Sequence, residues 1–246
     1  MFDIFAGKLS GSDIALRREE ISGLLLQKSC NIKGRSIKVL EGTDLELLFR
    51  LYDEIFLENW FRNNYKGKLE FGVSSRMTKS AGLTRCPKNI KGIKPEDVII
   101  EIKIGIDFFL SYGMVDGSGA VGGIETRDSL EALQLVFEHE LCHALEFINF
   151  GKSSCKGKRF KILANSLFGH TESCHKLPTH RQIAGSTLGI RIGDTVAFTF
   201  EGKKLKGILY RINKRATVMV PDRSGMMMDS QNKRYTKYYV PLSLIE

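Results

Sequence analysis

The feature that most constrains the fold is a long run of residues, 128–151, in which apolar side chains recur three and four positions apart. This spacing is typical of an α-helix with one buried face. Asp128, followed three residues later by Glu131, has the pattern of a helix-capping box, and Gly151 follows the last apolar residue as a stop signal. We therefore predict a helix over this run.

The predicted helix carries the pentapeptide His139-Glu140-Leu141-Cys142-His143. Residues four apart lie on the same face of a helix, so both imidazoles can reach a single ion, and Zn²⁺ is the ion that this pattern favours. Zinc lowers the pKa of a bound water to roughly 7, and a neighbouring carboxylate can take the proton. We predict His139 and His143 as metal ligands and Glu140 as the catalytic base. The alternative is an ordinary buried helix whose histidines are only hydrogen-bonded.

Length and composition fit a chain of one or two domains, since 246 residues with 42% hydrophobic side chains can form a sizeable core. The most apolar stretch, 98–115, is interrupted by Glu101, Lys103 and Asp107, so no membrane span is expected. The first residues lack the basic and apolar regions of a secretory signal. Five scattered cysteines without a CxxC pair favour a reducing compartment. We expect a cytoplasmic protein, or one associated with DNA in the nucleoid or nucleus.

The charge of the chain is uneven. Residues 181–246 contain 12 lysines and arginines against 5 aspartates and glutamates, and the whole chain has a net charge of +9. A basic segment of this kind favours an anionic partner, and nucleic acid is the obvious class. The alternative is a basic solvated surface with no dedicated ligand.

Before residue 180 the patterns predict a mixed α+β domain, and after residue 189 they predict short strands of a small antiparallel barrel. Five glycines in residues 113–123 predict a loop, either a flap over the site or a passive connector. Tyrosines in the barrel could stack on bases or simply pack. The other predicted helices are 12–28, 43–60, beginning at an N-cap on Thr43, and 158–168; the predicted strands are 34–42, 68–75, 78–84, 98–104, 195–200, 207–213, 217–221 and 235–241.

Three segments together resemble the SprT-like zinc metallopeptidase domain, the family that includes Spartan. They are residues 52–60, residues 74–82 with the pattern S-x-R-M-x-x-x-A-G, and residues 137–144 around the histidines. The resemblance covers roughly residues 40–170 and implies a zincin-like α+β fold, for which we predict a domain at residues 40–180. Residues 1–39 would then be an N-terminal extension, and residues 189–246 resemble a small all-β barrel-like domain appended to some members. The family implies a zinc protease, and its best-known members digest proteins crosslinked to DNA.

The resemblance leaves the third zinc ligand open. In the family it is a histidine in a pattern similar to H-G-x-x-F, and here Lys156 stands at that position. A protonated ammonium has no lone pair to donate. Cys155 is the nearer candidate along the chain, whereas His170 offers the nitrogen more usual in hydrolytic sites. On chemistry we favour His170, with Cys155 as the alternative.

The sequence thus predicts a zinc-dependent metalloendopeptidase that uses Zn²⁺ as cofactor. Its partners would be a protein substrate and DNA, the latter bound through the basic C-terminal region, with no membrane partner. A second hypothesis is a non-catalytic nucleic-acid-binding module with a degenerate metal site, which Lys156 motivates. A third is a peptidase without any role at nucleic acid.

Overall fold

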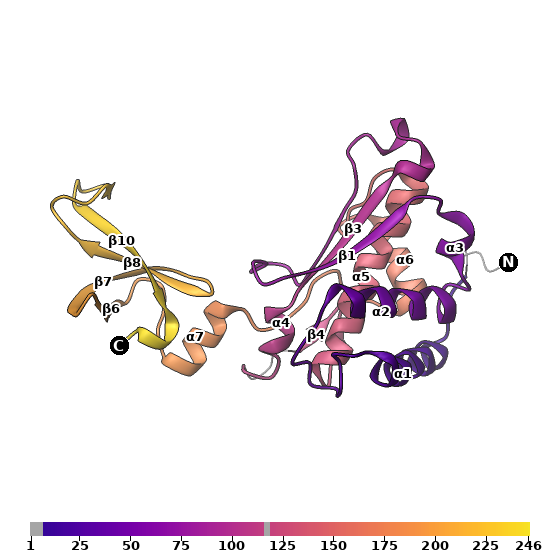
Figure 1. Ribbon diagram of the computed structural model, residues 1–246, viewed down its shortest axis with the longest axis horizontal. Helices are drawn as coiled ribbons and strands as arrows, with labels where there is room; N and C mark the ends of the chain where they lie inside the picture. The colour runs from indigo at the N-terminus through magenta and orange to yellow at the C-terminus, as the bar shows by residue number, and fades with distance from the viewer. Residues whose placement is uncertain (1–6, 116–118) are drawn as a thin grey trace. The chain divides into compact units, whose positions relative to one another are not determined.

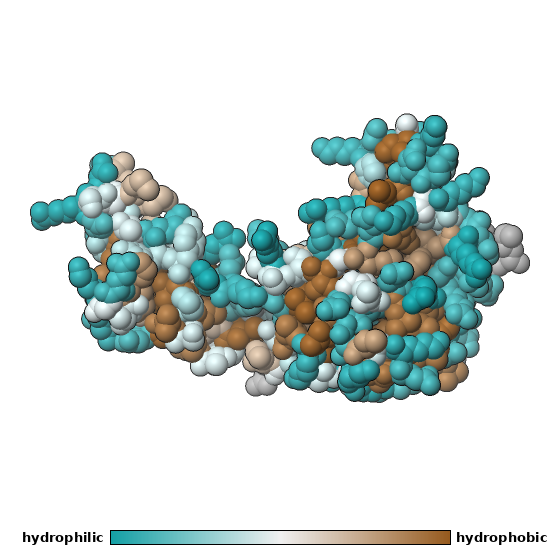
Figure 2. All heavy atoms as spheres, in the orientation of Figure 1, coloured by the Kyte–Doolittle hydropathy of each residue, from teal (hydrophilic) through white to brown (hydrophobic). Residues whose placement is uncertain are grey.

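The computed structural model describes residues 7–115 and 119–246, and the chain divides into two compact units, Met1–Leu177 and Pro178–Glu246. The first is a mixed α+β unit, and the second is formed mainly by a β-sheet (Figure 1). Within the described residues no helix is long and apolar enough to cross a membrane. Hydrophilic residues cover most of the visible face of each unit, with apolar side chains exposed between them (Figure 2).

The first unit contains six α-helices and five short strands among its described residues, together with two 3₁₀ turns. The α-helices are α1 (Gly11–Lys28), α2 (Gly42–Ile55), α3 (Trp60–Asn64), α4 (Asp107–Leu110), α5 (Ser129–Phe150) and α6 (Lys158–Phe168); the strands are β1 (Lys68–Ser74), β2 (Gly82–Arg85), β3 (Ile99–Gly105), β4 (Ala120–Val121) and β5 (Ile124–Glu125); the 3₁₀ turns are η1 (Ile90–Gly92) and η2 (Pro95–Asp97).

The main sheet of this unit has the order β1-β3-β2. Strands β1 and β3 are parallel, whereas β2 is antiparallel to β3 and forms one edge. The strands expected at 68–75 and 98–104 are confirmed to within one residue. The strand expected at 78–84 begins later, at Gly82, because the amide of Ala81 is bonded to the His175 side chain instead of to a strand.

Helix α5 packs against β2 and β3 and is in turn contacted by α1, α4 and α6, while α2 lies against β1. Residues from all these elements form one hydrophobic core. Ile14, Ile21 and Leu25 of α1 are buried in it, so the described part of the segment expected as an N-terminal extension belongs to the first unit.

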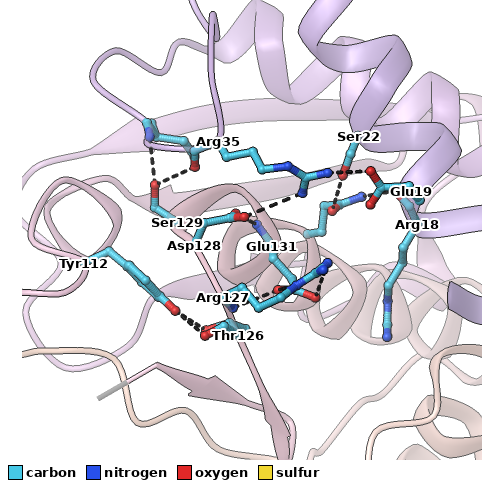
Figure 3. Close-up of polar contacts among 12 residues, drawn as sticks. Arg18, Glu19, Ser22, Arg35, Tyr112, Thr126, Arg127, Asp128, Ser129 and Glu131 are labelled. Carbon is cyan, nitrogen blue, oxygen red and sulfur yellow. Dashed lines mark hydrogen bonds and ion pairs between the residues drawn. The ribbon is translucent and has the colours of Figure 1, made fainter. Parts of the chain in front are cut away.

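The start of α5 is held by side chains on both sides of it (Figure 3). Asp128 is the N-cap and accepts a hydrogen bond from the Glu131 amide, which confirms the predicted cap. The Glu131 carboxylate accepts from the amide of Arg127 instead of Asp128, and Arg35 lies 3.5 Å from the Asp128 carboxylate. Gly151 ends the helix with a φ of 68°, a left-handed conformation that glycine adopts without strain.

Around α2 three expectations are wrong: no strand forms over residues 34–42, the helix ends at Ile55 and not at residue 60, and Thr43 is not its N-cap. The helix begins at Gly42, and Glu41 and Asp44 form a reciprocal capping box. An aspartate at the third helical position reaches back to the Glu41 amide at 2.8 Å, so the cap shifts two residues toward the N-terminus.

The glycine-rich segment expected as a loop at 113–123 is only partly described, because residues 116–118 lie outside the described residues. Beyond them, β4 and β5 form a two-stranded hairpin, and Val121 makes a β-bridge to His175. The end of this segment is therefore ordered by strand pairing.

The second unit contains one helix, α7 (His180–Leu188), and an antiparallel sheet of order β6-β7-β8-β10-β9. Its core includes Phe198, Leu209 and Val218. The last residue, Glu246, exchanges two backbone hydrogen bonds with Ala197 of β6, so the end of the chain returns to the first strand. The strands are β6 (Thr195–Phe200), β7 (Lys203–Ile212), β8 (Arg215–Pro221), β9 (Met227–Met228) and β10 (Arg234–Pro241), and η3 (Leu242–Leu244) follows them. All four predicted strands are present, and this unit also includes α7 and the residues from Pro178 onward.

Candidate metal centre

The two histidines of α5 converge as the helical spacing predicts. The Nε2 atoms of His139 and His143 lie 3.2 Å apart. Two nitrogens bound to one tetrahedral zinc, each about 2.0–2.1 Å from the ion, would be separated by roughly 3.3 Å. The spacing of these two atoms therefore fits a shared ion, and Phe160 of α6 packs against both rings, with centroids 4.8 and 4.5 Å away.

Both imidazoles are held in the neutral form that binds metal. Burial, with a smaller contribution from the neighbouring His143, lowers the pKa of His139 to about 3. Burial likewise lowers the pKa of His143 to about 4, against the opposing effect of Glu146. At neutral pH neither ring therefore carries the second proton that would make it a cation and repel a metal ion.

The orientation of His143 is set by a chain of hydrogen bonds that begins on the far side of its ring. Its Nδ1 lies 2.6 Å from the Ser153 hydroxyl, which donates to the buried carboxylate of Glu146, also at 2.6 Å. The hydroxyl has a single proton to give, so it accepts from Nδ1–H and leaves the Nε2 lone pair facing His139. Arg159 completes the chain with a 2.7 Å ion pair to Glu146. Such partners fix the tautomer of a metal ligand.

A third donor comes from Cys155, in the loop between α5 and α6. The ligand atoms of His139, His143 and Cys155 all lie within 4.8 Å of one another. Among the described residues this group can hold a metal ion, and two nitrogens with one thiolate are a donor set that zinc accepts. Lys156, which follows Cys155, is exposed.

The structure does not place His170 in this group, although it was the favoured third ligand. His170 is 3% exposed, and its Nε2 lies 2.8 Å from the Glu138 carboxylate. A carboxylate can only accept, so the Nε2 proton is committed there. The other nitrogen faces Gly122, where an added Cβ would lie 2.6 Å away. The preference of hydrolytic zinc sites for nitrogen ligands favoured His170, but His170 follows the C-terminus of α6, whereas Cys155 precedes its N-terminus.

Instead, His170 belongs to a buried polar network centred on Glu138, the residue that precedes His139. The Glu138 carboxylate is fully buried and receives two hydrogen bonds from Arg18, at 2.7 and 2.6 Å, and one from Tyr52 at 2.8 Å. Burial opposes ionisation of Glu138, yet Arg18 and His170 outweigh it and hold its pKa below the ordinary value. The network ties α1, α2 and the end of α6 to the residue preceding His139.

Glu140 is buried on α5 and faces the edge strand β2. Its carboxylate accepts a 2.7 Å hydrogen bond from the Thr84 hydroxyl. Burial raises its pKa to about 7, against the lowering effect of Thr84. A carboxyl with a pKa near neutral suits a group that accepts and returns a proton at physiological pH. A Cβ at Gly82 would lie 2.7 Å from the Glu140 Cγ, so only glycine leaves room for this side chain.

Sequence reasoning missed Ser153, Glu146, Arg159 and Thr84. Glu146 could have been inferred from the sequence, because it follows His143 by three residues on the same helix and therefore lies on the same side of that helix. The remaining three are brought to the site by tertiary folding, and no local pattern marks them.

Comparisons with known proteins identify no relative of this chain. No protein-family model matches the chain, and neither a curated protein nor a solved structure matches it.

Proposed function

We propose that this chain is a zinc-dependent metalloendopeptidase of the SprT-like kind. The observation that carries the proposal is the convergence of two neutral imidazoles, 3.2 Å apart at Nε2, with the Cys155 thiol. Glu140, a buried carboxylate, follows His139 directly in the chain. His139, His143 and Cys155 would hold the ion. When bound, zinc supplies a Lewis acid and lowers the pKa of a coordinated water.

The roles of the protein groups follow from their contacts. Glu140 takes a proton from the attacking water and returns it to the leaving amine, since its pKa of about 7 allows both transfers. Thr84 orients this carboxylate through its 2.7 Å hydrogen bond. The chain of Ser153 and Glu146 keeps His143 in the tautomer that presents Nε2.

The SprT-like assignment, with a zincin-like fold, is supported by the place of the second motif. The pattern S-x-R-M-x-x-x-A-G ends at Gly82, the position where a side chain would collide with Glu140. Two motifs that are far apart in the sequence thus meet at one carboxylate. Their meeting gives a physical reason for the glycine that ends the S-x-R-M-x-x-x-A-G motif.

Nucleic acid is the proposed second partner, through the C-terminal unit. Tyr210 and Tyr239 are 62% and 63% exposed. Arg211 and Tyr239 both pair with Thr217 across the sheet, and Lys237 lies two residues before Tyr239 on the same face. Exposed aromatic rings among basic side chains suit base stacking with phosphate contacts. We propose that this unit recruits proteins bound or crosslinked to DNA, in the cytoplasm, nucleoid or nucleus.

The test is cleavage of a DNA-binding protein by the zinc-loaded chain, with and without DNA. Glu140→Gln should abolish cleavage while zinc content and fold stay unchanged, because the substitution removes the base and keeps the shape. Glu46→Gln, which removes an exposed carboxylate on α2, is the matched control and should cleave normally. Equal cleavage by Glu140→Gln and wild type would contradict the mechanism.

One observation favours a second function. Lys156 occupies the position of the family's third histidine, which fits a non-catalytic nucleic-acid-binding module with a degenerate site. Folded, metal-free protein that still binds DNA would support the module. A peptidase unrelated to nucleic acid would instead cleave at a rate indifferent to DNA, whereas phosphate contacts make binding strongly salt-dependent.

A further inference from the structure

The outer surface of α6 carries a lysine hollow, a cavity of about 560 Å³ lined by Lys8, Lys156, Lys158 and Lys161 together with Ile162 and Ser166. The four lysines are exposed, and Ile162 is 51% exposed among them. The hollow lies wholly within the first unit, so it is separate from the basic C-terminal sheet.

No carboxylate of the described residues lines the hollow. The sequence contains no aspartate or glutamate between Glu146 and Glu172. Among the described residues, none of the four lysines forms an ion pair. Like charges that face one another without a carboxylate raise the local positive potential and attract an anion.

Two further features contribute to the positive potential of the hollow: one positions Lys8, and the other is the N-terminus of α6. The amide of Leu9 donates a 3.0 Å hydrogen bond to the Ser166 carbonyl, which fixes the N-terminal segment and Lys8 beside α6. The N-cap of α6, Gly157, offers no side-chain acceptor, and the first turn has no acidic residue. The positive end of the helix dipole therefore adds to the lysines.

The chemistry of the lining selects the ligand. Arg159, the only arginine of α6, turns away to Glu146 and to the Phe150 ring 3.9 Å from it, so the hollow offers lysines alone. Lysine binds phosphate as a point charge, without the fixed bidentate geometry that an arginine fork offers to a phosphate or a carboxylate. No aromatic ring lines the hollow, so it offers no platform for base stacking. Lys158 and Lys161 are about 4.5 Å apart along the helix axis, on the scale of the 3.4 Å rise between nucleotides of one strand.

We propose that the lysine hollow binds the phosphate backbone of nucleic acid, without regard to base sequence, on the unit that carries the metal centre. This inference rests on the proposed function, in which the chain cleaves proteins bound to DNA. The inner face of the same helix presents Phe160 to His139 and His143. Because an α-helix is about 10 Å across, the backbone would lie roughly one helix diameter from the site that cleaves the bound protein.

The experiment measures oligonucleotide binding by the full-length, zinc-loaded chain over a range of salt concentrations. Lys158→Gln/Lys161→Gln is compared with Lys38→Gln/Lys66→Gln, which removes the same charge from exposed sites of the first unit outside the hollow. Each lost phosphate contact should lower the slope of log K against log salt by about 0.7–0.9. The hollow variant should therefore lose about 1.4–1.8 and the control variant much less.

Chemical acetylation locates the contact independently. Oligonucleotide should protect Lys158 and Lys161 from acetylation and leave Lys38 and Lys66 reactive. Equal slope changes in both variants, or no protection at the hollow, would overturn the proposal. So would displacement by inorganic phosphate beyond the effect of equal ionic strength, which indicates a small-anion site, or tighter binding of an acidic peptide. None of these readouts depends on peptide cleavage, so failure here is distinct from failure of the proposed enzyme.

Discussion

The buried network around Glu138 predicts a large loss in the free energy of unfolding for Arg18→Met. This substitution removes two hydrogen bonds to the Glu138 carboxylate and a third, of 2.6 Å, to the Phe168 carbonyl. The side chains of Arg18 and Glu138 are 15% and 0% exposed, so the carboxylate that remains cannot recover its partner from water. Breaking a buried pair of this kind costs about 3–5 kcal/mol, and the surviving contacts from Tyr52 and His170 favour the lower end.

The assay is urea unfolding followed by the fluorescence of Trp60, the single tryptophan of the chain, which lies in the first unit. With a slope of about 2 kcal/mol/M, a loss of about 3 kcal/mol lowers the midpoint by about 1.5 M. Arg17→Met is the matched control, because the side chain of Arg17 donates to the carbonyls of Ile55 and Phe56 and lies over the Phe56 ring, but forms no ion pair with any described residue. That control should lose about 1–2 kcal/mol.

The double variant Arg18→Met/Glu138→Gln separates the ion pair from general packing. Removing the charge of Glu138 as well should restore part of the stability lost in Arg18→Met, since no buried carboxylate is then left uncompensated. A midpoint for Arg18→Met no lower than that of Arg17→Met, or strictly additive effects in the double variant, would refute this reasoning.

The same network sets a pH dependence of stability. Because the folded pKa of Glu138 lies below its ordinary value, its contribution is complete above the unfolded-state pKa of about 4.3 and is lost as pH falls through the folded pKa. Below pH 5 the unfolding midpoint of wild type should fall more steeply than that of Glu138→Gln. Parallel profiles would show that Glu138 titrates alike in both states.

Three further predictions concern the metal centre itself. Gly82→Ala should reduce peptide cleavage at least tenfold by displacing Glu140, whereas Gly72→Ala, whose added Cβ meets only the Lys103 side chain at 3.4 Å, should cleave as wild type does. Ser153→Ala should weaken zinc binding about 10–100-fold in a competition titration with a chelating dye, because His143 loses its orienting partner. Stripping zinc should lower the free energy of unfolding by about 4 kcal/mol if free zinc had been a thousandfold above its dissociation constant, which lowers the urea midpoint reported by Trp60 by about 2 M. An unchanged midpoint would show that the folded state has no preferential affinity for zinc.

The parts of the fold that could be predicted from the sequence are those determined by residues close together in the chain. Helix α5 and its cap at Asp128 follow from apolar spacing and short-range hydrogen bonding. The cap of α2 could not be placed at Glu41, because glutamate is a rare N-cap and the reciprocal bond from Asp44 becomes visible only in the fold. Strand β2 is shorter than predicted because the amide of Ala81 donates to His175, which is distant in sequence.

The candidate site divides in the same way. His139, Glu140 and His143 lie on one helix, so their juxtaposition follows from helical geometry alone. The third donor depends on how the loop after α5 folds back, and the usual preference of hydrolytic sites for nitrogen pointed to His170. That preference could not account for Glu138, whose buried carboxylate lies 2.8 Å from the His170 Nε2 and accepts its proton in a hydrogen bond.

The central claim is that His139, His143 and Cys155 hold one zinc ion beside Glu140, and metal analysis of purified protein tests it most directly. The wild-type chain and Glu140→Gln should each retain one equivalent of zinc after dialysis against a weak chelator. His143→Ala and Cys155→Ser should lose it, whereas Cys174→Ser, at an exposed cysteine outside the group, should keep it. Folded wild-type protein without bound zinc, or full retention by both His143→Ala and Cys155→Ser, would contradict the account.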